Sequence, residues 1–250
     1  MGYVSFVRMK RQGETMKITN SIALVTGANR GIGRALVEEL LNRGVGKVYA
    51  ASRGPEGPAQ ERVEQLRLDV TDPASVAAAA RVAADVNLLI NNAGVLDWGD
   101  ILETPLEALK RNLDVNLYGK LHMSRAFAPV IQQNGGGAIT NILTLLSLAS
   151  MPGASVYNAS KAAAWSMSMS LRATLSERGV AVHNVFPGAV DTDMLGGVEM
   201  PKTGPAEVAR AVVAGIEADH EDILPDPMSS SVYEQWRQNH KAVEKQFAAM

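Results

Sequence analysis

The feature of this sequence that most constrains its fold is a regular alternation of short apolar runs with helical patterns. The apolar runs have the length of buried strands, whereas the stretches between them repeat apolar residues every three or four positions. Strands separated by helices pair in parallel when each helix crosses a face of the sheet. The sequence therefore predicts an α/β fold, a single doubly wound parallel sheet with helices on both faces.

Start and stop signals divide the chain into these elements. Gly44 and Gly179 follow predicted helices, Asp72-Pro73 places an N-cap and a first-turn proline before another, and Thr104–Glu107 has the spacing of a capping box. The predicted strands cover residues 22–25, 47–52, 65–68, 86–90, 138–143, 180–186 and, as a short last strand, 223–224. The predicted helices cover residues 31–43, an alanine-rich stretch from 73, and residues 105–131, 157–178 and 205–218.

Length and composition fit one globular domain. The chain has 250 residues, of which 46% are hydrophobic and 20% are charged, as in an ordinary globular protein. Residues 1–16 carry three basic side chains but no apolar core of signal-peptide length. We interpret residues 1–16 as an N-terminal extension before a single domain of residues 17–250, although Met16 could equally be the true start.

Charge and hydropathy exclude several classes of partner. A net charge of −2 argues against nucleic acid, which usually requires a basic surface. No apolar stretch reaches the roughly 18 residues of a membrane helix. The absence of cysteine excludes a thiol nucleophile and suits a reducing compartment. We expect a cytoplasmic protein that acts on a small molecule, with no nucleic-acid, membrane or metal partner.

A glycine-rich turn lies between the first predicted strand and the first helix. It reads Thr26-Gly-Ala-Asn-Arg-Gly-Ile-Gly33, with the spacing G-x-x-x-G-x-G. Glycines let the backbone turn sharply and let a pyrophosphate approach the amides at a helix N-terminus. A purely structural turn needs one glycine rather than three, so the pattern favours nucleotide binding.

The turn resembles the cofactor motif of the short-chain dehydrogenase/reductase family, whose spacing differs from the G-x-G-x-x-G of other Rossmann proteins. Three further motifs follow in the family's order: Asn91-Asn92-Ala93-Gly94 after the fourth strand, Tyr157-x-x-x-Lys161 on a helix, and Pro187-Gly188 after the sixth strand. The resemblance runs from about residue 22 to residue 225. It implies a Rossmann-type oxidoreductase domain that binds a nicotinamide dinucleotide.

The cofactor site implied by the resemblance involves the turns after the first four strands and the sixth, together with the helix that carries Tyr157 and Lys161. One position stays open, because Asp69 is either a contact to the adenine ring or a loop residue before the Asp72 cap. The implied cofactor-binding residues are Gly27, Asn29, Arg30, Gly31, Ile32, Gly33, Arg53, Asp69, Val70, Asn92, Ala93, Gly94, Tyr157, Lys161, Pro187, Gly188, Val190 and Thr192.

The end of the second strand bears on the choice between NAD and NADP. An acidic residue there holds the ribose 2′-hydroxyl of NAD, whereas this strand ends in Ser52-Arg53. The guanidinium groups of Arg53 and Arg30 suit a 2′-phosphate. The carboxylate of Glu56 complicates this interpretation but lies in a loop past the strand end. We expect NADP (NADPH) as the cofactor.

Tyr157 and Lys161 are four positions apart on a helix, so their side chains share one face. A phenol has a pKa of about 10, and a nearby ammonium is expected to lower it. The resemblance implies that Tyr157 exchanges the proton and that Lys161 tunes it and binds the nicotinamide ribose.

Two further positions complete the catalytic set that the resemblance implies. The family's serine, 13 positions before the tyrosine, corresponds to Thr144, with Ser147 as the alternative hydroxyl. Asn116 matches a residue that interrupts its helix and holds a water leading to the lysine.

The predicted function is NADP(H)-dependent interconversion of a carbonyl and an alcohol, as in a carbonyl reductase. The alternatives are a dinucleotide-binding regulator without turnover, which the threonine at 144 favours, and another Rossmann protein such as a methyltransferase. Residues 95–98, 148–153 and 194–200 should form a mainly apolar substrate pocket. Helices 105–131 and 157–178 are apolar on more than one face, which predicts a homodimer or homotetramer.

Overall fold

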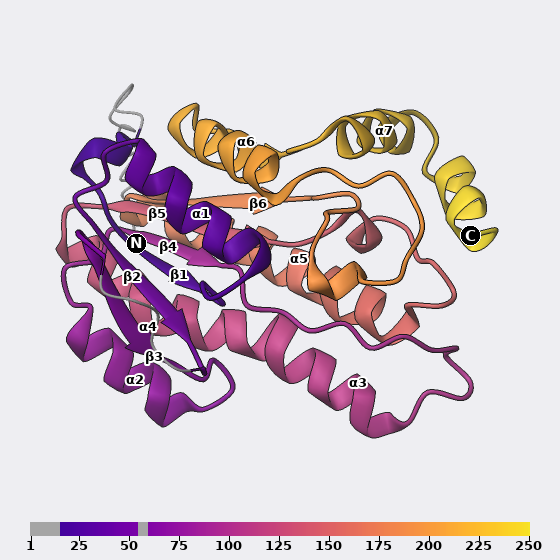
Figure 1. Cartoon of the computed structure of the whole chain (residues 1–250), viewed down its shortest axis with the longest axis horizontal. Coiled ribbons are helices and arrows are strands. Elements are labelled where there is room, and N and C mark those ends of the chain that lie inside the picture. The colour runs from indigo at the N-terminus through magenta and orange to yellow at the C-terminus, as the bar shows by residue number, and fades with distance from the viewer. Residues whose placement is uncertain (1–15, 55–59) are drawn as a thin grey trace, which may run out of the picture.

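The computed structural model describes residues 16–54 and 60–250, and these residues form a seven-stranded parallel sheet with helices on both faces (Figure 1). The strand order is β3-β2-β1-β4-β5-β6-β7, which confirms the doubly wound fold. Most of the predicted N-terminal extension and Glu56 lie outside the described residues. The strands are β1 (Ile22–Thr26), β2 (Lys47–Ser52), β3 (Val63–Arg67), β4 (Leu88–Asn91), β5 (Gly137–Ile142), β6 (Val180–Val185) and β7 (Asp222–Ile223).

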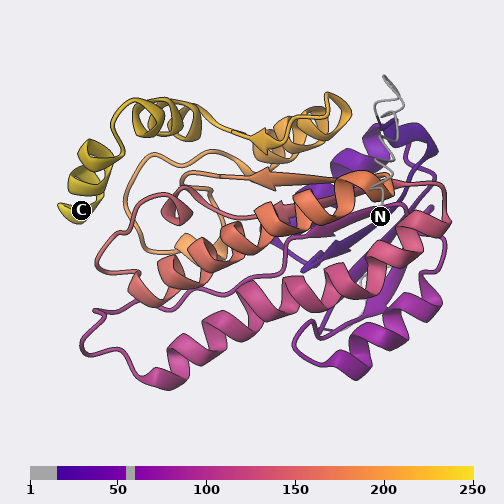
Figure 2. The ribbon, with the colours of Figure 1, turned by 180° about the vertical axis from the view of Figure 1, so that it is seen from behind.

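The helices lie in two layers, with α1 and α6 on one face of the sheet and α2, α4 and α5 on the other (Figures 1 and 2). They are α1 (Gly31–Asn42), α2 (Pro73–Val82), α3 (Leu106–Leu113), α4 (Lys120–Gln133), α5 (Ser155–Leu175), α6 (Pro205–Glu217) and α7 (Pro227–Ala248). Single turns include η1 (Ile18–Asn20), η2 (Asp114–Gly119), η3 (Leu145–Ser147), η4 (Ser176–Arg178) and η5 (Asp193–Leu195).

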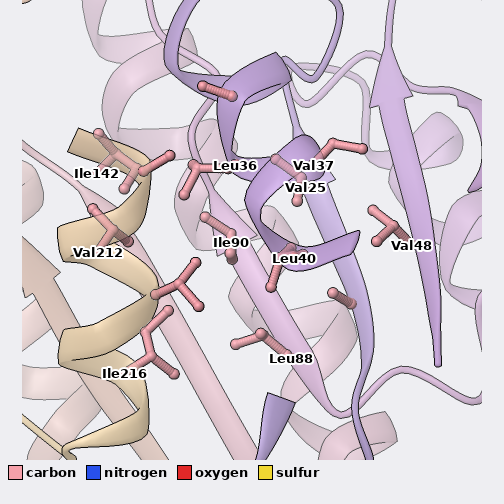
Figure 3. Close-up of a cluster of buried hydrophobic side chains, with 14 of the residues drawn as sticks. Val25, Leu36, Val37, Leu40, Val48, Leu88, Ile90, Ile142, Val212 and Ile216 are labelled. Atoms are coloured by element: carbon pink, nitrogen blue, oxygen red, sulfur yellow. The ribbon is translucent and has the colours of Figure 1, made fainter. Parts of the chain in front are cut away.

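The core between the sheet and the layer of α1 and α6 is a continuous set of aliphatic side chains. Figure 3 shows Leu36 and Leu40 of α1 in one cluster with Val212 of α6 and with Val25 and Ile90 of the central strands. All five are fully buried. Burial of an aliphatic side chain stabilises a fold by about 1.5–3 kcal/mol, so this layer holds α1 firmly on the sheet.

A row of buried asparagines crosses the opposite face of the sheet. Asn91, Asn141 and Asn184 are register partners on β4, β5 and β6. Asn91 Nδ2 donates to Asn141 Oδ1 at 3.0 Å, and Asn141 Nδ2 donates to Ser168 of α5 at 2.8 Å. The hydroxyl of Ser168 in turn donates to Asn184 Oδ1. Because buried amides require partners, this row favours one register for three strands.

The predicted start of the long helix needs correction, and the helix contains the interruption that the resemblance implies at Asn116. Thr104 does not cap it: its hydroxyl donates to the carbonyl of Asp100 at 2.6 Å, and the N-cap residue is Pro105. The predicted helix over 105–131 is α3, the π-helical turn η2 and α4 in succession. Local competition for the Thr104 hydroxyl explains the first difference, because threonine can also bond to a preceding turn.

The sequence interpretation also missed α7. Asp226 and Pro227 are its start signal, since Asp226 accepts from the amide of Ser229 at 2.8 Å in a capping box. Asn239 has a non-helical backbone, and α7 bends there (Figure 1). The other predicted elements are confirmed, with ends that differ by at most three residues.

The exposed side of α4, α5 and η2 is the surface through which copies of the chain are predicted to associate. Tyr118 and Met169 are large apolar side chains exposed there. Association of copies through these helices stays a prediction, which light scattering at micromolar concentration tests. Within residues 16–54 and 60–250, no helix has the length and apolar character needed to cross a membrane.

The two aspartate caps differ in what they hold, and this difference predicts their contributions to stability. Asp72 is exposed and accepts only from Ala74, whereas buried Asp226 also accepts from the amide of Gly188 at 2.9 Å. Asp72→Ala should therefore cost about 1 kcal/mol. Asp226→Ala should cost about 2–4 kcal/mol, because it also leaves a backbone amide unpaired. Urea unfolding measures both, and equal losses would contradict the assignment.

Candidate active site

A cavity of about 1300 Å³ opens at the carboxyl ends of the central strands. The chain reverses its direction of travel across the sheet between β1 and β4, and crevices in doubly wound sheets form at such a point. Every residue of the predicted cofactor set lines this cavity, from Gly27 in the first turn to Thr192 after β6. Thr144 lines it as well, but Asn116 does not.

The glycine-rich turn forms one end of the cavity. Gly27 and Gly31 have φ values of +66° and +53°, in the left-handed region that favours glycine. A Cβ on Gly33 would collide with the carbonyl oxygen of Gly27. Helix α1 begins at Gly31, and its N-cap residue Arg30 makes no side-chain cap. The first amides of α1 therefore remain available to an anion, and the turn fits a pyrophosphate.

The segment after β4 is bonded to this turn. Thr26 Oγ1 accepts from the amides of Asn92 and Ala93 at 3.0 and 2.9 Å. Asn92 Nδ2 donates to the carbonyls of Thr26 and Gly27 at 2.9 and 3.2 Å. These bonds place the Asn92–Gly94 backbone along the cavity wall. The sequence motif alone does not determine that position, because the bonds join segments far apart in the chain.

The two predicted phosphate-binding arginines lie on the exposed side of the cavity. Arg30 Nη1 is 3.1 Å from Asp193 Oδ2 of η5, and both side chains are exposed. This ion pair was not predicted, and it leaves Arg53 as the exposed arginine at the end of β2.

Asp69 lines the cavity and also forms the turn before Asp72, while its contact with an adenine ring stays a prediction. Its carboxylate accepts from the amide and the hydroxyl of Thr71, and these bonds, with a smaller effect from Arg53, lower the pKa of Asp69. The side chain therefore forms a turn, while the residue lines the cavity beside Val70.

Tyr157 and Lys161 lie together on the first turns of α5, as predicted. Lys161 Nζ is 5.5 Å from the ring centre of Tyr157 and donates to the carbonyl of Ile142 at 3.0 Å. Lys161 is buried, and burial lowers its pKa to about 8.

The pKa of Tyr157 differs from the expectation that the lysine would lower it. Burial raises this pKa above the ordinary value of the phenol, and the hydroxyl of Thr144 acts in the opposite direction but is the smaller effect. Lys161 directs its Nζ to a backbone carbonyl, and its own charge is disfavoured by burial. Tyr157 therefore keeps its proton at neutral pH.

The two candidate hydroxyls occupy different environments. Thr144 faces the cavity, where its Oγ1 accepts from the amide of Leu146 at 3.3 Å and lies 3.5 Å from the carbonyl of Pro187. Ser147 is buried away from the cavity lining, and its hydroxyl has no hydrogen-bond partner among the described residues. The geometry favours Thr144, while its chemical role stays a prediction.

Asn116 lies in the π-helical turn, so the predicted interruption of the helix is present. Its side chain is fully buried and bonds to both backbone groups of Val95, accepting at 3.0 Å and donating at 2.9 Å. It also donates to Ser160, the neighbour of Lys161, at 2.9 Å. Asn116 thus holds the wall after Gly94 from behind, and the predicted water stays untested.

The apolar end of the cavity contains the predicted segments and an additional one. Residues 95–98 and 194–200 contribute lining residues, as do Leu145 and Leu146, whereas the predicted segment 148–153 contributes only Met151 and Gly153. Sequence reasoning missed the C-terminal contribution, which is Met228, Phe247 and Met250. The cap at Asp226-Pro227 signals α7, but only the bend at Asn239 brings its far end to the cavity.

Comparison with known proteins supports this geometry. The sequence model of the short chain dehydrogenase family matches residues 21–202. A short chain dehydrogenase from Burkholderia cenocepacia, crystallised in complex with NADP, is 38% identical and superposes with a TM-score of 0.89, covering 93% of this chain and 99% of that chain.

Two further similar proteins differ in cofactor or in named activity. A short chain dehydrogenase/reductase from Burkholderia phymatum in complex with NAD is 26% identical with a TM-score of 0.78, covering 92% of this chain and 96% of that chain. A 3-oxoacyl-[acyl-carrier-protein] reductase from Vibrio harveyi is 31% identical over 231 residues, which is 79% of this chain and 90% of the relative.

These matches, the doubly wound sheet and the four motifs around one cavity agree, and they set aside the methyltransferase alternative. The chain belongs to the short-chain dehydrogenase/reductase family of oxidoreductases.

Proposed function

We propose that this protein is an NADP(H)-dependent oxidoreductase that interconverts a ketone or aldehyde with the corresponding alcohol. The observation that carries the proposal is the set of residues that line the cavity at the carboxyl ends of the strands. Tyr157, Lys161 and Thr144 line it together with the uncapped N-terminus of α1. A proton donor, a cation and a hydroxyl therefore lie within one enclosure that also fits a dinucleotide.

The nicotinamide, when bound, supplies or accepts the hydride, and the protein supplies orientation and the proton. The Tyr157 hydroxyl, which burial keeps protonated, is the donor to a carbonyl oxygen during reduction. The Thr144 hydroxyl would donate to the same oxygen and polarise it. Lys161, whose pKa is about 8, is mostly charged at neutral pH and stabilises the phenolate that remains.

The preference for NADP rests on the end of β2. Arg53 is exposed beside the cavity where NAD-specific folds have a carboxylate. Arg30 reaches the same side of the cavity and would exchange its exposed partner Asp193 for a phosphate, since exposed ion pairs are weak. One similar structure contains NADP and another contains NAD, so the comparisons do not decide between the two cofactors. The argument for NADP is therefore the two arginines.

The distribution of charged and apolar side chains along the described cavity lining indicates the substrate class. The charged side chains that line the cavity lie near the cofactor turns or the catalytic pair, and they are Arg30, Arg53, Asp69, Lys161 and Asp193. Away from these turns and the catalytic pair, the lining is mainly apolar and rich in methionine, including Met151, Met194, Met200, Met228 and Met250. Methionine adapts its shape to irregular apolar ligands. We infer an uncharged, apolar carbonyl compound as the substrate.

Removal of the Tyr157 hydroxyl tests the mechanism. Tyr157→Phe should lower the rate of NADPH-dependent ketone reduction by about 10²- to 10⁴-fold while leaving the NADPH Kd within about twofold, because only the proton donor is lost. Tyr49→Phe is the control, since Tyr49 bonds to Lys47 and Asp85 outside the cavity lining. A Tyr157→Phe variant that keeps more than about a tenth of the rate, with a deuteride isotope effect showing that hydride transfer is limiting, would exclude this role. If unmodified protein binds NADPH but turns over no carbonyl, the regulator alternative stands.

Charge reversal at the end of β2 tests the cofactor. Unmodified protein should bind NADPH more tightly than NADH, and Arg53→Asp should reduce or reverse the difference by about tenfold or more, because a carboxylate repels the 2′-phosphate and suits a 2′-hydroxyl. Arg34→Ala is the matched control, since exposed Arg34 pairs with Glu38 on α1 and does not line the cavity. Equal affinities of the unmodified protein for both cofactors would refute NADP specificity.

Matched substrates test the apolar pocket. A straight-chain methyl ketone and a keto acid of equal carbon number, with its carboxylate at the far end, should differ in kcat/KM by about tenfold or more in favour of the ketone. A carboxylate without a partner is costly to bury among methionines. A keto acid that reacts as fast as the ketone would contradict the assigned substrate class without affecting the proposed reaction.

A further inference from the structure

Lys120, the first residue of α4, is a buried lysine that the proposed reaction does not use. Its side chain is 2% exposed, and no carboxylate of residues 16–54 or 60–250 forms an ion pair with it. Burial and the charge of Lys161 lower the pKa of Lys120 well below its usual range. An unpaired buried amine is unfavourable, so an apolar side chain would stabilise the fold better at this position.

The partners of Lys120 are backbone carbonyls at the cavity wall. Its Nζ donates to the carbonyl of Asn91 at 2.8 Å and lies 3.4 Å from that of Ala93. Asn91 is the last residue of β4, and Ala93 lines the cavity. Lys120 thus contacts the wall but is not itself one of the residues that line the cavity.

The wall segment Asn91–Gly94 is held from both sides. Its amides at Asn92 and Ala93 donate to Thr26 Oγ1, and its carbonyls at Asn91 and Ala93 face Lys120. A Cβ on Gly94 would lie 3.6 Å from Lys161 Nζ, so the segment also borders the catalytic lysine. A shift of this backbone would move the cavity wall and disturb the surroundings of Lys161 together.

We propose that Lys120 is a positioning residue that holds the Asn91–Gly94 backbone in the conformation that binds the nicotinamide cofactor. The unfavourable burial of its amine is then retained for cofactor binding rather than for stability, as is common at functional sites. The inference rests on the proposed cofactor but not on catalytic turnover, because its test measures cofactor affinity without a reaction.

Lys120→Met and Lys120→Gln separate positioning from packing. Methionine fills similar volume without a donor, whereas glutamine keeps a donor on a shorter side chain. NADPH affinity, measured by quenching of tryptophan fluorescence, should fall about tenfold in Lys120→Met and about threefold in Lys120→Gln, because buried hydrogen bonds to the wall are lost or weakened. Thermal stability should follow the opposite order, with Lys120→Met at least as stable as the unmodified protein.

Ser124→Ala is the matched control. Ser124 lies one turn further along α4 and contacts the same residue, since Asn91 Nδ2 donates to its hydroxyl at 3.4 Å. This contact involves the Asn91 side chain rather than the wall backbone, so the NADPH Kd should remain within about twofold. A folded Lys120→Met or Lys120→Gln variant with an unchanged Kd overturns the proposal, and so does a loss of affinity that follows the loss of stability. Either result is distinct from a failure to reduce ketones, which concerns the proposed function alone.

Discussion

The hydrogen bonds between Thr26 and the segment after β4 are the interaction on which the cavity depends. Thr26 Oγ1 accepts two successive amides, and Asn92 returns two bonds to the glycine-rich turn. These bonds join the ends of β1 and β4, the pair of strands between which the chain reverses its direction across the sheet. The glycine turn and the opposite wall therefore form one rigid unit, to which the other cavity walls are added.

The groups proposed to react are arranged around this unit by elements from later in the chain. Helix α5 supplies Tyr157 and Lys161, and the turn after β5 supplies Thr144. Asn116 ties the wall to α5 by bonding to Val95 and Ser160. All four side chains are buried, and those of Lys161, Thr144 and Asn116 also bond to backbone groups. Their mutual geometry is therefore set before a ligand binds, as electrostatic catalysis requires.

Burial has opposite effects on the pKa values of the tyrosine and the lysine of the proposed catalytic pair. It disfavours the charged form of each, so the pKa of Tyr157 rises and that of Lys161 falls to about 8. At neutral pH the tyrosine therefore holds a proton to donate, while the lysine still carries most of its charge. A lysine on the surface would be fully charged but screened by water, and it would act more weakly on a phenolate.

The sequence by itself determined the fold class and most of the candidate site. Local patterns were sufficient for two reasons. Apolar runs of strand length that alternate with helical patterns indicate parallel strands joined by helices, and a spacing of four residues places Tyr157 and Lys161 on one face of a helix. The tertiary structure alone decided which groups those residues contact. The ion pair of Arg30 with Asp193, the contacts of Lys120 with the wall and the approach of Phe247 to the cavity join segments far apart in the chain. The direction of the Tyr157 pKa was decided in the same way, since it depends on burial by surrounding elements, which no local motif encodes.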